Sequence, residues 1–246
     1  MPPNTRTLKG QSYCSQRWAN PAWPKGSKSR GFSNCDHDVE VPFASSLAVG
    51  SVVCSDGSVL TDGEFDKSGK EAVGIVFHVN RNPDIEGLGY AVYIRDMEPL
   101  AFADSLGVDQ GTSASLTAED GNANTYALFT AEDVSSPMAI KVFDLWTYGQ
   151  SAYVPSVRQL ALLFDVRQYV NGRIADVGGD PIDFGADGCW LWSSTEVEGQ
   201  KEDKAWLYSM QSGVMQETPK DQPHRFRPVI TIYNVKPVGG INLVRT

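Results

Sequence analysis

The clearest periodic pattern of hydrophobic residues lies in the first part of the C-terminal half of the chain. In "YVPSVRQLALLFDVRQYVNG", apolar residues recur at the three- and four-residue spacing of one helix face. Ser156 is typical of an N-cap, and Gln159, three residues later, completes a capping box. Asn171-Gly172 predicts the end of the helix. We therefore expect one principal helix over about residues 156–170, with Leu160 and Phe164 on the face that belongs to the core.

Short runs rich in β-branched and aromatic residues lie on both sides of this helix. Asp56-Gly57 predicts a hairpin between residues 51–54 and 58–60. Further strands are expected at 72–80, 89–97, 189–193, 205–210 and 225–233, with a turn at 211–213 that leads into "VMQET". Residues 104–137 are mostly small and polar, which predicts loops with a short helix near 126–129. The resulting fold class is α+β, with mixed antiparallel sheets, one principal helix and long loops.

The two ends of the chain differ in pattern from this central part. Residues 1–45 are rich in Pro, Ser, Asn and Gly and show neither a helical nor a strand period, which predicts an extended arm laid over this chain or a neighbouring one. An oligomer formed through the arm is one possibility. We expect the boundaries to be 1–45 for the arm, 46–234 for one domain and 235–246 for a C-terminal tail.

Charge and hydropathy exclude several classes of partner. Lys and Arg number 21 against 30 Asp and Glu, which gives a net charge of −9. Such a chain is not attracted to phosphate backbones, so nucleic acid is not an expected partner. No stretch approaches the ~18 consecutive apolar residues of a membrane span. The start, "MPPNTRTLKG", has no apolar signal-peptide core, so we expect no secretion signal within this sequence.

The four cysteines show no C-x-x-C pair, and a structural zinc site is therefore not expected. Three disulfide pairings are open. If the protein is exported, we expect a Cys14–Cys35 disulfide in the weakly cored arm, whereas Cys54 and Cys189 fall in predicted strands and are expected to be buried thiols.

No catalytic motif is visible in the chain. G-x-S-x-G and H-E-x-x-H are absent. His37, His78 and His224 lie in the arm, in a strand and in the last loop, and no Ser or Cys nucleophile motif is visible near His78. A Gly-rich loop over 176–187 carries four acids but lacks the EF-hand calcium pattern, so a solvated loop is favoured and calcium binding stays open. These acids are Asp176, Asp180, Asp183 and Asp187. We expect no catalytic residue, no metal and no cofactor.

Motifs in the C-terminal part resemble a known family. "AYVPSVRQLALLFD", "VNGRIADVGGDPI", "CWLWSSTE", "KAWLYSMQSGV" and "HRFRPVI" follow one another in the order of the C-terminal domain of the Legionella collagen-like adhesin and of the Fibrobacter succinogenes major paralogous domain. "GSVVCSDGSVL" and "AVGIVFHVN" are similar to the opening of the Bacteroidetes versions. The resemblance covers about residues 49–233.

This resemblance implies a C-type-lectin-like fold, in which the first and last strands pair and an irregular loop region presents a binding surface. Calcium-mediated sugar binding is not implied, because Glu-Pro-Asn, Gln-Pro-Asp and Trp-Asn-Asp triplets are absent. Formylglycine-generating enzymes share this broad fold and use a cysteine-dependent copper site, whereas Cys189 has no second cysteine beside it in the C-terminal region of this chain. In "SSTE", Glu196 is expected to pair with Arg225 or Arg227.

The expected function is that of a non-enzymatic, adhesin-like binding protein, secreted or at the cell surface, with a glycan or protein ligand. The alternatives are a structural or tip subunit of a pilus or phage tail, a retroelement-diversified receptor-binding protein, and a diverged formylglycine-generating-type enzyme. Two charged loops, at 197–204 and 216–224, are expected to be exposed on one side of the domain, beside an aromatic platform. The expected ligand-binding residues are Glu198, Gln200, Lys201, Lys204, Trp206, Tyr208, Gln216, Glu217, Lys220 and His224.

Overall fold

The protein has the α+β class that its sequence predicts. The computed structural model describes residues 47–82, 85, 87–147, 150–186 and 188–233, together with the backbone of two short paired strands, β1 (Thr5–Arg6) and β2 (Val41–Pro42). Four helices and antiparallel sheets lie within these described residues. The remainder of the expected arm and the tail at 235–246 fall outside them, so the boundaries 1–45 and 46–234 stay predictions.

The larger sheet has five strands in the order β14-β6-β5-β3-β4. Its strands are β3 (Val52–Cys54), β4 (Val59–Leu60), β5 (Ala72–Val79), β6 (Gly89–Tyr93) and β14 (Val229–Ile232). The predicted hairpin is confirmed: Val52 lies opposite Leu60, and Gly57 takes a positive φ of 79° in the turn, a conformation that favours glycine.

The family resemblance implies that the first and last strands of the domain pair with each other. Among the described strands this expectation is wrong, because β3 and β14 are not neighbours. β14 pairs with β6, where Val229 lies opposite Val92. On its other side, Tyr153 and Val229 exchange two backbone hydrogen bonds of 2.9 Å. Both edges of β14 are therefore occupied at Val229, and β5 and β6 separate the strand from β3.

A second antiparallel sheet contains β10 (Trp190–Glu196), β11 (Lys204–Ser209) and β12 (Met215–Pro219). The predicted turn at 211–213 is confirmed, with a φ of 74° at Gly213. The final predicted strand, 225–233, is shorter than expected. It is limited to β14 because Pro228 has no N–H to donate to a ladder. Residues Pro223–His224 form β13, which pairs with β7 (Leu100–Ala101).

The principal helix, α5 (Val157–Asp176), begins as predicted but ends later. Ser156 and Gln159 form the expected capping box. The predicted end at Asn171-Gly172 is wrong, because Arg173 and Ile174 are buried and extend the packed face by a further turn. The Asn171 side chain bonds both backbone groups of Ile182, at 2.7 and 2.8 Å, instead of ending the helix.

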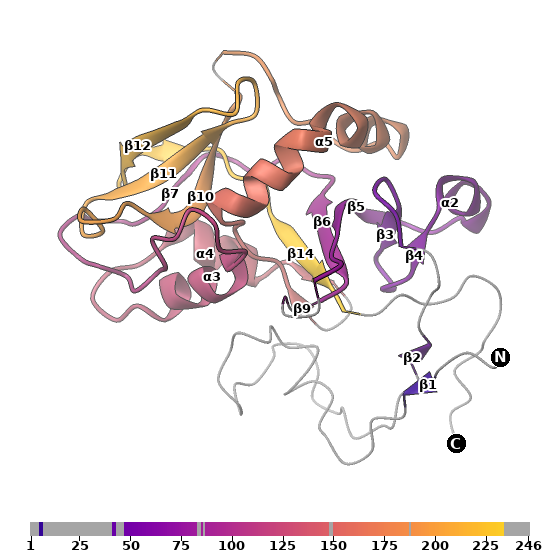
Figure 1. The fold of residues 1–246 in the computed structure, drawn as a ribbon, viewed down its shortest axis with the longest axis horizontal. Coiled ribbons are helices and arrows are strands. Elements are labelled where there is room, and N and C mark those ends of the chain that lie inside the picture. Colours follow the sequence, from indigo (N-terminus) through magenta and orange to yellow (C-terminus); the bar gives the residue numbers. More distant parts are fainter. Residues whose placement is uncertain are drawn as a thin grey trace.

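Three shorter helices complete the described part: α2 (Asp62–Ser68), α3 (Gly121–Thr130) and α4 (Pro137–Phe143). α3 contains the helix predicted near 126–129. α2 and α4 were not predicted, since seven residues are too few to show a clear helical period. In Figure 1, α3 and α4 lie together below β10 and β11, while α2 lies at the opposite end of the molecule beside β4.

Helix α5 crosses the molecule between the two sheets, as Figure 1 shows. One hydrophobic cluster joins α5 to both sheets through Ile75, Leu160 and Tyr208. The other lies on the opposite faces of the sheets and includes Trp192 and Met138. Both faces of β10 are consequently core. Leu160 is fully buried as predicted, whereas Phe164 is only half-buried and packs at the margin of its cluster.

Candidate functional site

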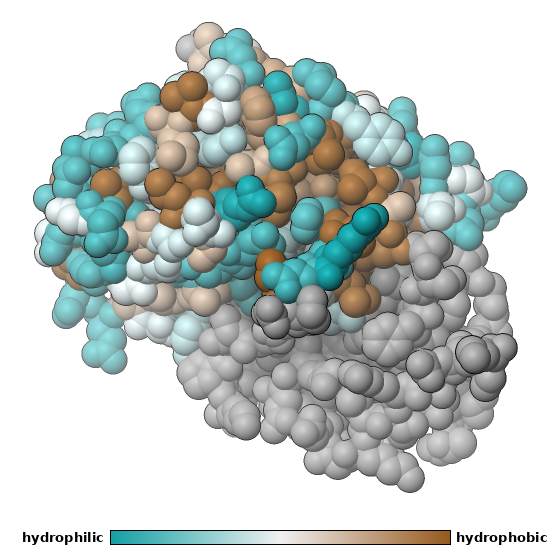
Figure 2. Space-filling model, in the orientation of Figure 1, coloured by the Kyte–Doolittle hydropathy of each residue, from teal (hydrophilic) through white to brown (hydrophobic). Residues whose placement is uncertain are grey.

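The turn between β10 and β11 is the surface feature that the sequence singled out. It is closed by a backbone hydrogen bond of 3.0 Å from Val197 N to Lys204 O, and Gly199 has a φ of 73°. Glu198 and Gln200 are exposed as expected, whereas Val197 is buried and Lys201 half-buried. Figure 2 shows hydrophilic residues gathered at this end of the molecule, on the left where Figure 1 places β11 and β12.

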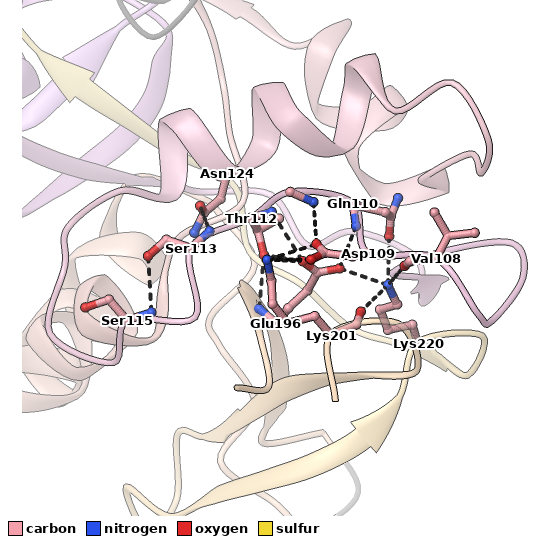
Figure 3. A network of polar contacts seen from close by, with 11 residues as sticks. Val108, Asp109, Gln110, Thr112, Ser113, Ser115, Asn124, Glu196, Lys201 and Lys220 are labelled. Carbon is pink, nitrogen blue, oxygen red and sulfur yellow. Dashed lines mark hydrogen bonds and ion pairs between the residues drawn. The ribbon is translucent and has the colours of Figure 1, made fainter. Parts of the chain in front are cut away.

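A buried carboxylate lies directly beneath this turn. Glu196, the last residue of β10, has no solvent-exposed surface. Its carboxylate accepts hydrogen bonds from the backbone N–H groups of Gln110 (3.1 Å) and Thr112 (3.2 Å) and from the Thr112 hydroxyl (2.9 Å). Figure 3 shows these contacts, through which the segment 108–112 is attached to the end of β10.

The nearer counterion of Glu196 is Lys220, which is equally buried; the Lys201 ammonium lies 3.8 Å from Glu196 Oε2. The Lys220 ammonium donates to Glu196 Oε1 at 2.9 Å and to the carbonyl oxygens of Val108 and Lys201, each at 2.7 Å. An ammonium has three protons, and each of these acceptors can take one. The expected exposure of Lys220 is therefore wrong, and Figure 3 shows how segments from three parts of the chain converge on it.

The expected pairing of Glu196 with Arg225 or Arg227 is also wrong. Both arginines instead form ion pairs with Asp96, which follows β6; Arg227 Nη2 lies 3.6 Å from Asp96 Oδ1. Arg227 is buried and donates to the backbone oxygens of Tyr93 and Asp180. These two arginines thus hold the end of the larger sheet instead of the end of β10.

One face of β11 and β12 brings four of the expected residues together. Trp206 lies directly opposite Glu217, so their side chains share a face, and Lys204 is on the same face two residues earlier. Lys204 Nζ lies 3.1 Å from Glu217 Oε2, and the Gln200 amide donates to the same oxygen at 3.3 Å. Trp206 is half-buried. We call Gln200, Lys204, Trp206 and Glu217 the Trp206 surface.

The neighbouring aromatic residue, Tyr208, belongs to the core. It lies on the same face as Trp206, but α5 covers it, and the Phe164 ring packs edge-on against it with centroids 6.0 Å apart. Burial raises the pKa of Tyr208, with Asp165 adding to the effect. Of the two aromatic residues on this face, only Trp206 is accessible to a ligand.

The other expected residues are not part of the Trp206 surface. Gln216 is exposed on the opposite face of β12, because it lies opposite Leu207. Lys201 pairs with Asp109 at 2.9 Å. His224 is half-buried and packs edge-on against Trp192, with centroids 5.3 Å apart. Burial lowers the pKa of His224.

The segment 108–112, which supports the site, was not identified from the sequence. Asp109, Gln110 and Thr112 lie in a small, polar stretch without periodicity. The contacts of Gln110 and Thr112 with Glu196 join residues 86 and 84 positions apart. No local pattern predicts such a contact, and the buried partner at Lys220 resembles an ordinary surface lysine in the sequence.

In the 176–187 loop, each of the three aspartates that the structure describes interacts with another group of the protein. Asp176 pairs with Arg173 at 2.8 Å, Asp180 with Arg95 at 3.6 Å, and Asp183 accepts from the backbone N–H of Gly185 at 2.7 Å. Asp187 lies outside the described residues. Within the described part of the chain, no group of three or more His, Cys, Asp or Glu side chains is placed to hold a metal ion.

Comparisons of the chain with models of known families and with curated proteins found no match. In the part of the chain that the structure describes, no helix has both the length and the apolar character needed to cross a membrane.

Proposed function

We propose that this protein is a non-enzymatic, adhesin-like binding protein, secreted or at the cell surface, whose ligand is a glycan or a protein. The observation that carries the proposal is the Trp206 surface. A half-buried indole ring lies beside the amide of Gln200 and the paired charges of Lys204 and Glu217. An aromatic ring with hydrogen-bonding groups around it suits both the apolar face of a sugar ring and a protein side chain.

The support beneath this surface favours recognition without a large rearrangement. The turn that carries Gln200 begins at Glu196, and the Lys220 ammonium binds the backbone of Lys201 within the same turn. Since both charges are buried and fully hydrogen-bonded, the turn has a fixed base. A preorganised surface loses less conformational entropy when a ligand binds.

The charges on the surface favour a ligand without net charge. Lys204 and Glu217 neutralise one another at 3.1 Å, and no further cation is paired with Glu217 among the described residues. Both groups still have hydrogen-bonding capacity for hydroxyl or amide groups. A neutral glycan meets these requirements as well as a neutral protein surface does.

The finer assignment to a C-type-lectin-like fold is part of this proposal. It is supported by the order of the C-terminal motifs and by the long irregular segment over 104–118 that is attached to the second sheet through Glu196. The separation of β3 from β14 is a departure from the implied pattern.

A glycan array with matched variants tests the function. We expect the purified protein to bind a defined set of neutral glycans, and Trp206→Ala to abolish that binding. Gln216→Ala is the control, because Gln216 is exposed on the same strand as Glu217 but on the other face. Protein ligands are tested by the same comparison on an array of extracellular proteins. Equal binding by the Trp206→Ala and wild-type proteins on both arrays would refute the proposal.

A further inference from the structure

A cleft of about 500 Å³ lies at the end of the larger sheet where β5 begins and β6 ends. Its volume is within the range of small-molecule sites. The apolar part of its wall includes Phe65 of α2, Val73 of β5, Leu145 after α4 and Val177 after α5. It shares no lining residue with the Trp206 surface.

The shape of this cleft depends on an irregularity in the sheet. Val53 lies opposite Gly74 and Cys54 opposite Ala72, so Val73 is an extra residue without a partner on β3. Such a β-bulge redirects side chains and is common beside binding sites. Val73 O still accepts from Ile94 N at 3.0 Å, which keeps β6 attached across the bulge.

A close backbone contact brings the end of α5 to the cleft. Asp180 N donates to Ile94 O at 2.7 Å, and a Cβ atom on Gly179 would lie 2.7 Å from the same oxygen. Only glycine permits this approach. The contact holds the chain that follows Val177 against β6, and the apolar wall is therefore built from elements that are fixed relative to one another.

The rim of the cleft carries charges of both signs. Lys70 and Arg95 are the cations, and Glu71 and Asp144 are the anions. Because Gly74 lies opposite Tyr93, residues 71 and 95 come to the same end of the β5–β6 pair. The two signs of charge thus lie close to one apolar wall.

Two of these charged groups remain available to a ligand. Arg95 is 60% exposed, and its nearest carboxylate, on Asp180, is 3.6 Å away, so most of its guanidinium donors are open to solvent. Glu71 is exposed, and no hydrogen bond or ion pair of its carboxylate is seen among the described residues. Lys70 is different, since its ammonium already binds Asp56 at 3.0 Å and Ser58 Oγ at 2.9 Å.

We propose that the cleft binds a small zwitterion with an apolar chain, of the amino-acid type. Its carboxylate binds the planar fork of Arg95, its ammonium binds Glu71, and its chain packs on Val73, Leu145 and Val177. A ligand with a single charge leaves one of the two rim groups unpaired, and a ligand without an apolar chain leaves the wall in water.

Three six-carbon probes distinguish these ligand types: norleucine, hexanoate and hexylamine. Each is titrated into the full chain, and amide chemical shifts are followed by NMR. We expect norleucine to shift the amides of Val73, Leu145 and Val177, with a Kd at least about tenfold lower than that of either singly charged probe. An equal or higher affinity for hexanoate or hexylamine would overturn the proposal, as would the absence of shifts at the cleft.

Variants connect the binding to the two rim groups. Arg95→Gln and Glu71→Gln are each expected to raise the Kd for norleucine by about tenfold, because each removes one charge-assisted contact. Arg158→Gln is the control, since Arg158 is an exposed arginine on α5 outside the cleft. Norleucine binding that survives both rim variants unchanged would refute the assignment. The glycan and protein arrays are unaffected by these changes, so the two proposals fail independently.

Discussion

The ammonium of Lys220 lies 2.9 Å from the carboxylate of Glu196, and neither side chain has any surface in contact with solvent. The two residues are 24 positions apart, and their further hydrogen bonds reach residues 108–112 and 201. This ion pair is the point at which the long polar segment after β7 is attached to the second sheet. Removal of Glu196 leaves the Lys220 ammonium buried without a carboxylate, and removal of Lys220 leaves Glu196 with only the more distant Lys201 ammonium, 3.8 Å from its Oε2.

Lys220→Met is therefore expected to destabilise the protein by about 3–5 kcal/mol, the usual cost of breaking a buried ion pair on one side. Urea denaturation followed by tryptophan fluorescence measures the change in the free energy of unfolding. Lys204→Met is the matched control, because Lys204 forms a half-exposed pair with Glu217 and should cost no more than about 1 kcal/mol. Similar losses in both variants would show that the Lys220 pair has no special structural role.

Two residues on the same helix should differ in their contribution to stability. Leu160 is fully buried, whereas Phe164 is half-buried with its ring between Tyr208 and the Arg167 guanidinium, 3.6 Å from the ring centroid. We expect Leu160→Ala to cost about 3–4 kcal/mol and Phe164→Ala about 2 kcal/mol, less than the 3–5 kcal/mol of a fully buried phenylalanine. Thermal and urea unfolding of the two variants shows which substitution lowers the free energy of unfolding more. A larger loss for Phe164→Ala would contradict the observed burial.

Two glycines in helices, Gly121 and Gly172, should respond in opposite ways to substitution by alanine. A Cβ atom on Gly121, at the start of α3, would lie 2.6 Å from Ser156 N and 2.7 Å from Val154 O. These are backbone atoms that cannot move aside, so Gly121→Ala should destabilise the protein by about 1–3 kcal/mol. Gly172 in α5 has open space around its Cβ position, and Gly172→Ala should stabilise by about 0.5–1 kcal/mol. The melting temperatures should move in opposite directions, and a shift of the same sign in both would contradict this.

Local signals explain what could be predicted from the sequence. The start of α5 depends on Ser156 and Gln159, three residues apart, and the β3–β4 hairpin depends on Gly57 within its turn. The end of α5 was misplaced because Asn171 and Gly172 are typical of helix ends, whereas the burial of Ile174 is decided by tertiary packing. Tertiary packing of this kind routinely overrides local preference.

The candidate site was predicted only in part, for the same physical reason. Gln200, Lys204, Trp206 and Glu217 were among the expected ligand-binding residues, and the cross-strand register places Trp206 opposite Glu217. Lys220 was expected at the surface, because lysine is rarely buried without a partner. Its partner and the two carbonyl groups that complete its shell come from segments that approach only in the folded chain, and no local pattern contains them.

The two buried cysteines should be protected from thiol reagents in the native protein. Cys54 and Cys189 are buried free thiols, and burial raises the pKa of Cys54, which lowers its thiolate fraction. A thiol reagent should therefore label neither in the native protein and both in urea.

Cys14 and Cys35 lie outside the described residues, and the disulfide expected between them in an exported protein stays a prediction. Mass spectrometry of unreduced peptides tests it, and a link that involves Cys54 or Cys189 would contradict both expectations.

His224 should make stability depend on pH in the range where histidine titrates. Burial lowers its pKa in the folded protein, so the unfolded chain, with a histidine pKa of about 6.5, binds a proton first as the pH falls. Stability rises with pH wherever the unfolded state binds more protons. The contribution of His224 is thus complete above about pH 7 and is lost as the pH falls through 6.5 toward the lowered folded value.

Urea unfolding at pH 7.5 and at pH 5.5 measures this loss in the wild-type protein and in His224→Gln. Burial also lowers the pKa of His78, although Glu119 opposes the effect, and His78 is present in both proteins, so its contribution cancels in the comparison. Aspartates such as Asp56, whose pKa of about 2 reflects hydrogen bonds from Ser58 and Lys70 that outweigh its partial burial, titrate below this range. We expect a smaller decrease in the free energy of unfolding for His224→Gln, because glutamine takes up no proton. An equal decrease in the two proteins would show that the packing of His224 against Trp192 does not disfavour its charged form.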